Sequence, residues 1–195
     1  MDHFNIQPLD LSKRDELLAF FDRAFEDNPK WGGCYCHCFY ADHSVVDWPS
    51  RKPEENRAAT FALIGQGKMM GWIAHAQGMA IGWCNAAPKS WVTAVRDEPD
   101  PYEDCEMTGF ISCFLVHPAW RGRGVAKALL EAACVGLASC GLVVAEANPR
   151  SEAQSAADNH FGPLSMYLSA GFVVDRTDTD GSVYVRRTLQ SHARS

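Results

Sequence analysis

The chain of 195 residues is 47% hydrophobic and 22% charged, the composition of an ordinary globular protein rather than of a disordered, fibrous or membrane chain. Its net charge of -6 argues against a nucleic-acid partner, because neutralising phosphates requires a surplus of Lys and Arg. The sequence shows neither a basic leader nor an apolar run of about 20 residues, so we expect a cytoplasmic protein without a membrane partner. Its eight cysteines are then expected to be free thiols, and the length fits one domain, residues 1–195.

Residues 1–68 are predicted to hold a strand, a helix, an irregular stretch and a second helix. The strand is Phe4 to Leu9, where apolar and polar residues alternate. Ser12 and Asp15 resemble a capping pair in front of a helix whose apolar residues are Leu17, Leu18, Phe21 and Phe25. The irregular stretch 31–50 leads to a second helix, which begins at Pro53 and whose inward positions are Ala58, Phe61, Ala62 and Ile64.

Residues 69–137 and 138–190 alternate strands with helices. Met69 to Ala76 and Met79 to Ala86 flank Gln77-Gly78, a pair suited to a tight turn, and predict an antiparallel hairpin. After a loop at 88–106 we expect a buried strand, a glycine loop, a helix and a short strand, at 108–116, 121–124, 125–137 and 142–145. A helix at 163–170 and strands at 172–175 and 182–188 complete a mixed α/β order.

The glycine loop that follows the buried strand predicts an anion site. Such a loop presents unpaired N–H groups and the positive end of the helix dipole. Gly122 and Gly124 allow close approach of the backbone, and Arg121 and Arg123 add positive charge. The spacing matches neither a dinucleotide motif nor a P-loop, since no Lys-Ser or Lys-Thr follows Gly124. The residues alone therefore predict a diphosphate site, with a plain helix start as the alternative.

The segment 114–130 resembles the GCN5-related N-acetyltransferase (GNAT) family. Arg121, Gly124 and Ala126 match its Arg/Gln-x-x-Gly-x-Gly/Ala signature, residues 114–118 are similar to its central strand, and 167–172 are similar to its Tyr-x-x-x-Gly-Phe element. The resemblance spans about Met69 to Val185. It implies a mixed, mostly antiparallel twisted sheet with helices on both faces and a splayed central strand pair.

The same resemblance implies acetyl-CoA as co-substrate, with the pyrophosphate on the glycine loop and the pantetheine arm along the central strand. The residues implied to bind it are Phe114, Leu115, Val116, Arg121, Gly122, Arg123, Gly124, Val125, Ala126 and His160. His160 stands where the family often has an Asn, and Asn159 beside it is an alternative, as is a solvated loop without contact to the cofactor.

Acetyl transfer to an amine needs a proton acceptor for the amine and a proton donor for the leaving thiolate. The resemblance makes Tyr167 the donor, with a packing role as the alternative. The base is open, because Phe110 stands where the histone-modifying members carry a glutamate. Glu106 is our candidate. The alternatives are water and the side chains of Asp104, Glu146 and His117.

Aromatic residues and cysteines gather between the first two predicted helices, where the family generally builds its acceptor pocket. We expect the substrate to contact Trp31, Cys34, Tyr35, Cys36 and Trp83. The C-x-C-x-C spacing is poor for structural zinc, so no metal is expected. The acidic run 97–106 would steer a cationic amine, unless it is only a solvated loop.

The leading hypothesis is an N-acetyltransferase that moves an acetyl group from acetyl-CoA to a primary amine of a small molecule or peptide. One alternative is a module that senses acyl-CoA without turnover. Another is a redox or metal switch built on the cysteines of the same scaffold. The sequence leaves open the acceptor, the acyl chain length and the oligomeric state, a homodimer included.

Overall fold

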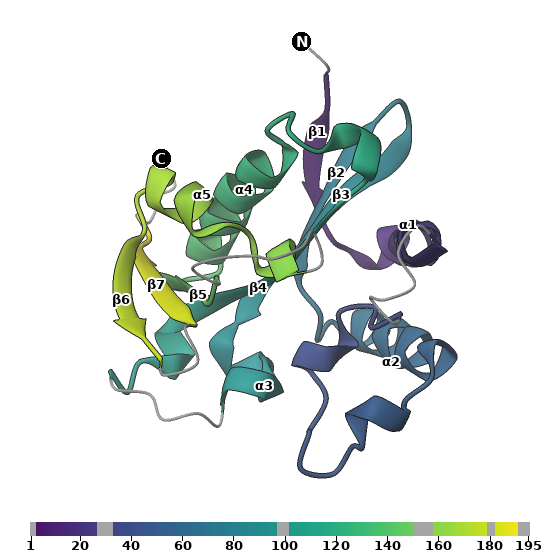
Figure 1. The fold of residues 1–195 in the computed structure, drawn as a ribbon, viewed down its shortest axis with the longest axis horizontal. Coiled ribbons are helices and arrows are strands. Elements are labelled where there is room, and N and C mark those ends of the chain that lie inside the picture. Colours follow the sequence, from purple (N-terminus) through teal and green to yellow (C-terminus); the bar gives the residue numbers. More distant parts are fainter. Residues whose placement is uncertain (1–2, 27–32, 97–101, 150–157, 179–181, 191–195) are drawn as a thin grey trace.

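A computed structural model of the protein describes residues 3–26, 33–96, 102–149, 158–178 and 182–190. Within these ranges the strands form one sheet in the order β1-β2-β3-β4-β5-β7-β6 (Figure 1). The strands β4 and β5 are parallel neighbours, and the other neighbouring pairs are antiparallel. The strands are β1 (Asn5–Pro8), β2 (Gly71–Ala76), β3 (Met79–Pro88), β4 (Thr108–Val116), β5 (Val144–Ala147), β6 (Val173–Thr177) and β7 (Val183–Thr188).

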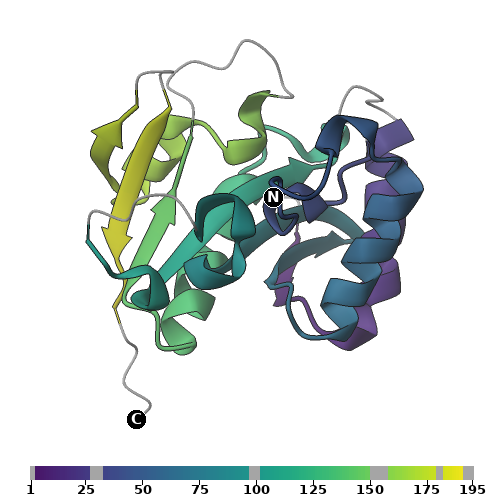
Figure 2. The ribbon, with the colours of Figure 1, turned by 90° about the horizontal axis from the view of Figure 1, so that it is seen from below.

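Helices cover both faces of this sheet. The α-helices are α1 (Arg14–Glu26), α2 (Pro53–Gly65), α3 (Thr93–Arg96), α4 (Val125–Ser139) and α5 (Leu164–Ser169). Short 3-10 helices connect them at η1 (Leu11–Lys13), η3 (His37–Phe39), η4 (Trp48–Ser50), η5 (Lys89–Trp91), η6 (Cys105–Met107), η7 (Pro118–Trp120) and η8 (Asp158–Phe161). Figure 2 shows α1 and α2 side by side at one end of the molecule, with β6 and β7 at the other.

Two main groups of buried side chains lie on the two faces. Leu129, Leu130 and Leu137 of α4 pack with Tyr167 of α5 in the larger group. Leu17 and Phe21 of α1 pack against Trp83 of β3 in the second group. A third, smaller group joins Phe110 of β4 to the neighbourhood of α3. The predicted architecture, a mostly antiparallel sheet with helices on both faces, is confirmed.

The predicted hairpin and the buried strand are observed. The β2–β3 turn places Gln77 and Gly78 at φ angles of 53° and 73°, as a tight two-residue hairpin turn requires. The strand β4 has the predicted bounds, whereas β5 begins at Val144, two residues after the predicted start. No helix in the described ranges is long and apolar enough to cross a membrane.

Two local predictions in the first part of the chain were wrong. The cap before α1 is Asp10, which accepts the Ser12 N–H at 2.9 Å and so replaces the expected role of Ser12. Of the predicted inward residues of α2, Ile64 is buried, whereas Ala58, Ala62 and Phe61 are exposed, the last beneath the Arg14 guanidinium. The other buried residues of α2 are Asn56 and Thr60. The reason is that α2 packs against the loop that follows α1. The main-chain carbonyls of Gly33 and Tyr35 in that loop accept hydrogen bonds from the Asn56 and Thr60 side chains.

The central strands diverge part-way along their length. Only the first half of β4, Thr108 to Ile111, pairs with β5, while β4 pairs with β3 along Gly109 to Val116. An irregularity in the β3–β4 register falls between Asn85 and Ala86. Among the described residues, the second half of β4 therefore has no neighbouring strand on the β5 side.

Candidate active site

The loop between β4 and α4 has the geometry of an anion site. Gly122 and Gly124 have φ angles of 72° and 83°, a region that side chains other than glycine rarely adopt. A Cβ added at either glycine would meet no described atom within 4 Å, so the backbone faces open space. Gly124 caps α4 without a side-chain hydrogen bond, which leaves the first-turn N–H groups of α4 available to an anion.

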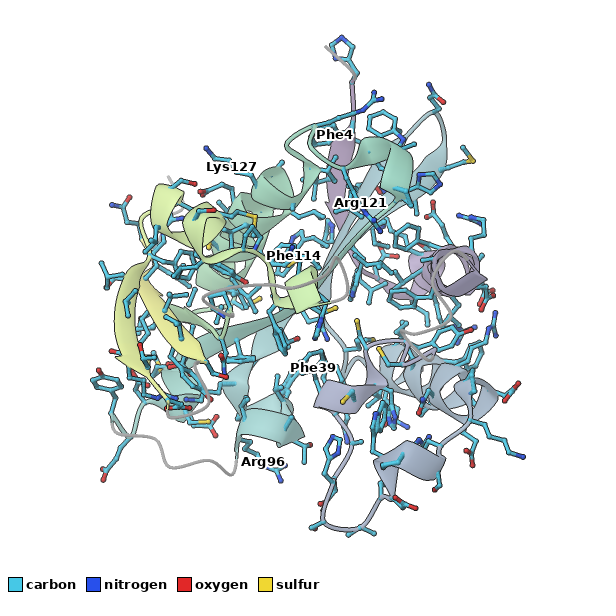
Figure 3. The ribbon with its side chains drawn as sticks, viewed as in Figure 1. Phe4, Phe39, Arg96, Phe114, Arg121 and Lys127 are labelled. Atoms are coloured by element: carbon cyan, nitrogen blue, oxygen red, sulfur yellow. The ribbon has the colours of Figure 1, made fainter. Side chains whose placement is uncertain are left out.

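A groove of about 440 Å³ runs from this loop along the free edge of β4. Its lining residues are Phe114, Val116, Trp120, Arg121, Gly122, Gly124, Val125, Ala126, Lys127, Asn159, Gly162, Pro163 and Met166. Figure 3 shows Phe114 near the centre of the molecule, with Arg121 and Lys127 above it. The groove thus has a cationic end at the start of α4 and an apolar end at the point where β4 and β5 diverge.

Most of the residues predicted to bind the cofactor line this groove, and three do not. Leu115 points to the opposite face of the sheet, where it packs with the α1 and α2 side chains. The Arg123 guanidinium lies 5.4 Å from the Trp120 ring, and the His160 ring stacks on Phe161, with its neighbour Asn159 in the groove. Sequence reasoning missed Trp120 and Lys127, although both flank the glycine motif directly.

Tyr167 lies behind the groove rather than on its surface. It is fully buried on α5 and packs edge to face against Phe114, which lines the groove. Its hydroxyl donates to the main-chain carbonyl of Phe161 at 2.7 Å. Burial raises the pKa of Tyr167 well above its ordinary value, so the hydroxyl stays protonated at neutral pH.

The loop that follows α1 brings most of the predicted substrate residues into the core. Trp31 lies outside the described residues. Tyr35 and Cys36 are buried, and the Trp83 indole N–H donates to Cys36 Sγ at 3.3 Å. Burial raises the pKa of Cys34 to about 12, so this half-buried thiol is unreactive at neutral pH. Tyr35 and Cys36 thus anchor the loop that follows α1 in the core, and Trp83 of β3 holds Cys36 through its indole N–H.

The sequence of this chain matches the profile of a known protein family. The profile described as the Acetyltransferase (GNAT) family matches residues 19–157, more than two thirds of the chain. The chain belongs to the GNAT acetyltransferase family. Membership implies acyltransferase activity. No curated protein matches the chain in sequence.

Solved GNAT structures share the fold of this GNAT protein at low sequence identity. A GCN5-related N-acetyltransferase from Kribbella flavida is 21% identical, with a TM-score of 0.58 over 95% of this chain and 98% of that one. A putative acetyltransferase from Salmonella typhimurium, solved with its cofactor acetyl-CoA, is 18% identical, with a TM-score of 0.57 over 97% and 96%. The PaiA N-acetyltransferase from Thermoplasma acidophilum, in complex with coenzyme A, is 14% identical, with a TM-score of 0.56 over 95% and 99%.

The candidate base Glu106 and its carboxylate alternatives Asp104 and Glu146 are not among the described residues that line the groove. Glu106 is exposed on η6, before the start of β4 and so at the end opposite Val116. Glu146 is fully buried and is the register partner of Phe110, where its oxygens lie 3.0 Å from Lys89 Nζ and from an Arg186 nitrogen. Asp104 pairs with Arg186 as well. His117 Nδ1 accepts the Ala119 N–H at 3.2 Å. The alternatives to Glu106 are thus engaged in structural contacts.

Proposed function

We propose that this GNAT protein transfers an acetyl group from acetyl-CoA to a primary amine of a small molecule or peptide. The observation that carries the proposal is the groove. It joins the start of α4, which has no side-chain cap, to the edge of β4 that β5 leaves open. A bound acetyl-CoA supplies an activated thioester. The charge, shape and polarity of the groove suit a ligand with a diphosphate at one end and a narrow arm with amide groups at the other.

Each part of the groove has a proposed role in holding that ligand. The N–H groups at the start of α4 bind the diphosphate, with Arg121 and Lys127 as cations beside them. The Arg121 Nε also donates to Val116 O at 3.0 Å, so this side chain fixes the end of β4 against the loop. Main-chain groups of Phe114 and Val116 pair with the amides of the arm, because β5 leaves that edge open.

Proton transfer is assigned to one side chain and to water. Tyr167 is the proposed donor to the leaving thiolate, since its raised pKa keeps the proton on the hydroxyl and its ring adjoins Phe114. To act, the hydroxyl must release the Phe161 carbonyl, and the fully buried ring must become accessible from the groove. Water is the proposed acceptor of the amine proton, because Glu106 lies beyond the other end of β4.

Free-thiol release from acetyl-CoA with a panel of primary amines tests the proposal. Turnover above background hydrolysis with at least one amine is the expected result, together with coenzyme A binding measured by calorimetry. Binding of coenzyme A without thiol release for any amine would instead identify a sensor. Failure to bind coenzyme A would show that the groove is not a coenzyme A site.

A further inference from the structure

Asn85 on β3 carries a buried hydrogen-bond donor that has no acceptor in the part of the chain that the structure describes. The residue is 1% exposed, and the Tyr40 hydroxyl donates to its Oδ1 at 2.8 Å. Among the described residues, no acceptor lies within hydrogen-bonding reach of its Nδ2. A buried amide N–H without a partner is unfavourable and is rare in folded proteins, so this one calls for a ligand or a water.

The amide lies beside the place where the groove begins. Asn85 is the register partner of Cys113, which directly precedes the groove residue Phe114. The irregularity in the β3–β4 pairing starts at Asn85, and β4 leaves β5 after Ile111. Asn85 therefore sits at the level where the central strands separate, on the face that carries Trp83 and the α1 and α2 helices.

Tyr40 fixes the amide with its donor end free. The main-chain carbonyl of Tyr40 accepts a hydrogen bond from Thr93 Oγ1 at 3.2 Å, which ties the residue to α3. Because the Tyr40 hydroxyl takes up Oδ1, the other end of the Asn85 amide offers only N–H groups. A ligand that satisfies Nδ2 must then bring an oxygen acceptor.

Aromatic side chains lie next to Tyr40, the hydrogen-bond partner of this amide. Phe39, next to Tyr40, packs against both the Trp83 group and the Phe110 group of buried side chains. Its ring meets the Phe161 ring of η8 edge to face at 6.1 Å, and both rings are only partly buried. Figure 3 shows Phe39 below Phe114, on the other side of the diverging strands. The exposed parts of these rings offer an apolar surface to a side chain of a ligand.

We infer that Asn85 Nδ2 binds a carbonyl oxygen of the acceptor, which makes the preferred acceptor an α-amino carbonyl compound with an apolar side chain. The inference rests on the proposed function. Asn85 lies one register step from Phe114 along the strands, so the proposed ligand carries its carbonyl oxygen close to the reacting nitrogen. A plain alkylamine lacks that oxygen and leaves Nδ2 unpaired on binding.

Phenylalaninamide and phenethylamine form a matched pair of probes, since the second is the first without its carboxamide. The measured quantity is the ratio of their kcat/KM values. The two amines differ in basicity, but at one pH that difference is common to every variant and cancels between them. We expect the ratio to fall by about 10- to 100-fold from the wild type to Asn85→Leu. A peptide that begins with Phe, as a third acceptor, distinguishes a peptide N-terminus from a single amino amide.

Asn56→Leu is the matched control, because Asn56 is also a buried Asn of this region but has both ends of its amide paired, with Gly33 O and Arg51 Nε. It should lower stability without changing the ratio. Should Asn85→Leu fail to fold, Asn85→Asp keeps the size and the Tyr40 contact and removes the N–H groups, and the same fall in the ratio is expected.

The dissociation constants of the two amines in the presence of coenzyme A give the same ratio without turnover. If no amine is acetylated but this ratio falls in Asn85→Leu, the proposed function fails and the Asn85 site stands. An equal ratio in the wild type and in the Asn85 variants, by both measurements, overturns the inference and leaves a buried water as the partner of Nδ2.

Discussion

The loop that begins α4 and the loop that follows α1 both contain residues with positive φ angles, but the residues and their surroundings differ. In the first loop these are Gly122 and Gly124, which are exposed and face open space. In the second they are Gly33 and two non-glycine residues, Tyr35 and Cys36, which are buried and have φ angles of 50° and 55°.

The difference shows how each side of the site is held. Non-glycine residues in the left-handed region are strained, and the second loop offsets that strain with side-chain contacts. Tyr35 donates to Asp22 at 2.7 Å and accepts from Thr60 at 2.9 Å through its carbonyl, while Cys36 accepts from Trp83. The side proposed to bind the acetyl donor is therefore built from bare backbone, whereas the side proposed to bind the acceptor is built from packed side chains.

The strongest test of this contrast is Gly124→Glu. The new side chain enters the space in front of the first turn of α4, with a negative charge where the diphosphate is proposed to bind. We expect affinity for coenzyme A, measured by calorimetry, to fall by more than about 100-fold, or about 3 kcal/mol of binding free energy.

Gly141→Glu is a matched control for that variant. Gly141 has a φ angle of 87°, and a Cβ there also meets no described atom within 4 Å, but it follows the other end of α4. Both variants carry the same backbone strain of about 1–2 kcal/mol. Equal loss of coenzyme A affinity in the two would show that strain, and not the anion site, explains the effect.

A smaller effect is expected from Tyr167→Phe, which tests the proposed proton donor to the leaving thiolate. If the hydroxyl protonates the thiolate, kcat should fall by about 100-fold at pH 7 while the KM for acetyl-CoA stays nearly constant. The wild-type rate should show no loss from ionisation of Tyr167 up to pH 10, because its pKa is raised.

Tyr35→Phe provides the comparison on the acceptor side. Each variant loses one hydrogen bond of 2.7 Å, to Phe161 O or to Asp22, and should lose a similar stability of about 0.5–1.5 kcal/mol in thermal unfolding. Only Tyr167→Phe is expected to lose kcat. A loss of stability in Tyr167→Phe with full kcat would make Tyr167 a support for η8 and nothing more.

The loop proposed to bind the acetyl donor was predictable from the sequence, because an anion site made of main-chain groups requires particular residue types. A tight approach to an anion demands glycine at fixed positions, so the loop with Gly122 and Gly124 was identified from its residues, while Phe114 was identified through the resemblance to the GNAT family. Lys127 was missed because a cation after such a motif has no fixed position. The hairpin turn at Gln77-Gly78 was predictable for a similar local reason.

The acceptor side was not predictable, because its side chains are placed by contacts distant in sequence. Cys36 contacts Trp83, 47 residues later, and Asn85 contacts Tyr40, 45 residues earlier. Helical spacing alone pointed Phe61 inward, but the loop carbonyl groups select Asn56 and Thr60 instead. The cluster of aromatic residues and cysteines was visible in the sequence, but whether each residue supports the loop or faces a ligand depends on tertiary packing.

The smallest expected effect concerns Asp22, which ties α1 to α2 and to the acceptor loop through Arg57 and Tyr35. Burial works against ionisation, yet the hydrogen bonds from Arg57 and Tyr35 lower the pKa of Asp22 below 3.8. A carboxylate whose pKa is lower in the folded state adds stability above its unfolded pKa, and that stability is lost as the pH falls through the folded value. The Asp22 side chain is 39% exposed, so the contribution is under about 1 kcal/mol.

Melting temperatures of the wild type and of Asp22→Asn between pH 2 and pH 6 test this role. The wild type should be the more stable protein above about pH 4, and the difference should shrink as the pH falls below that, because both proteins then carry a neutral side chain at position 22. Asp47→Asn, a change at an exposed side chain, serves as the control and should show no such convergence. A constant difference between the wild type and Asp22→Asn down to pH 2 would mean that the amide disturbs packing. The acceptor loop would then depend on the shape of this contact rather than on its charge.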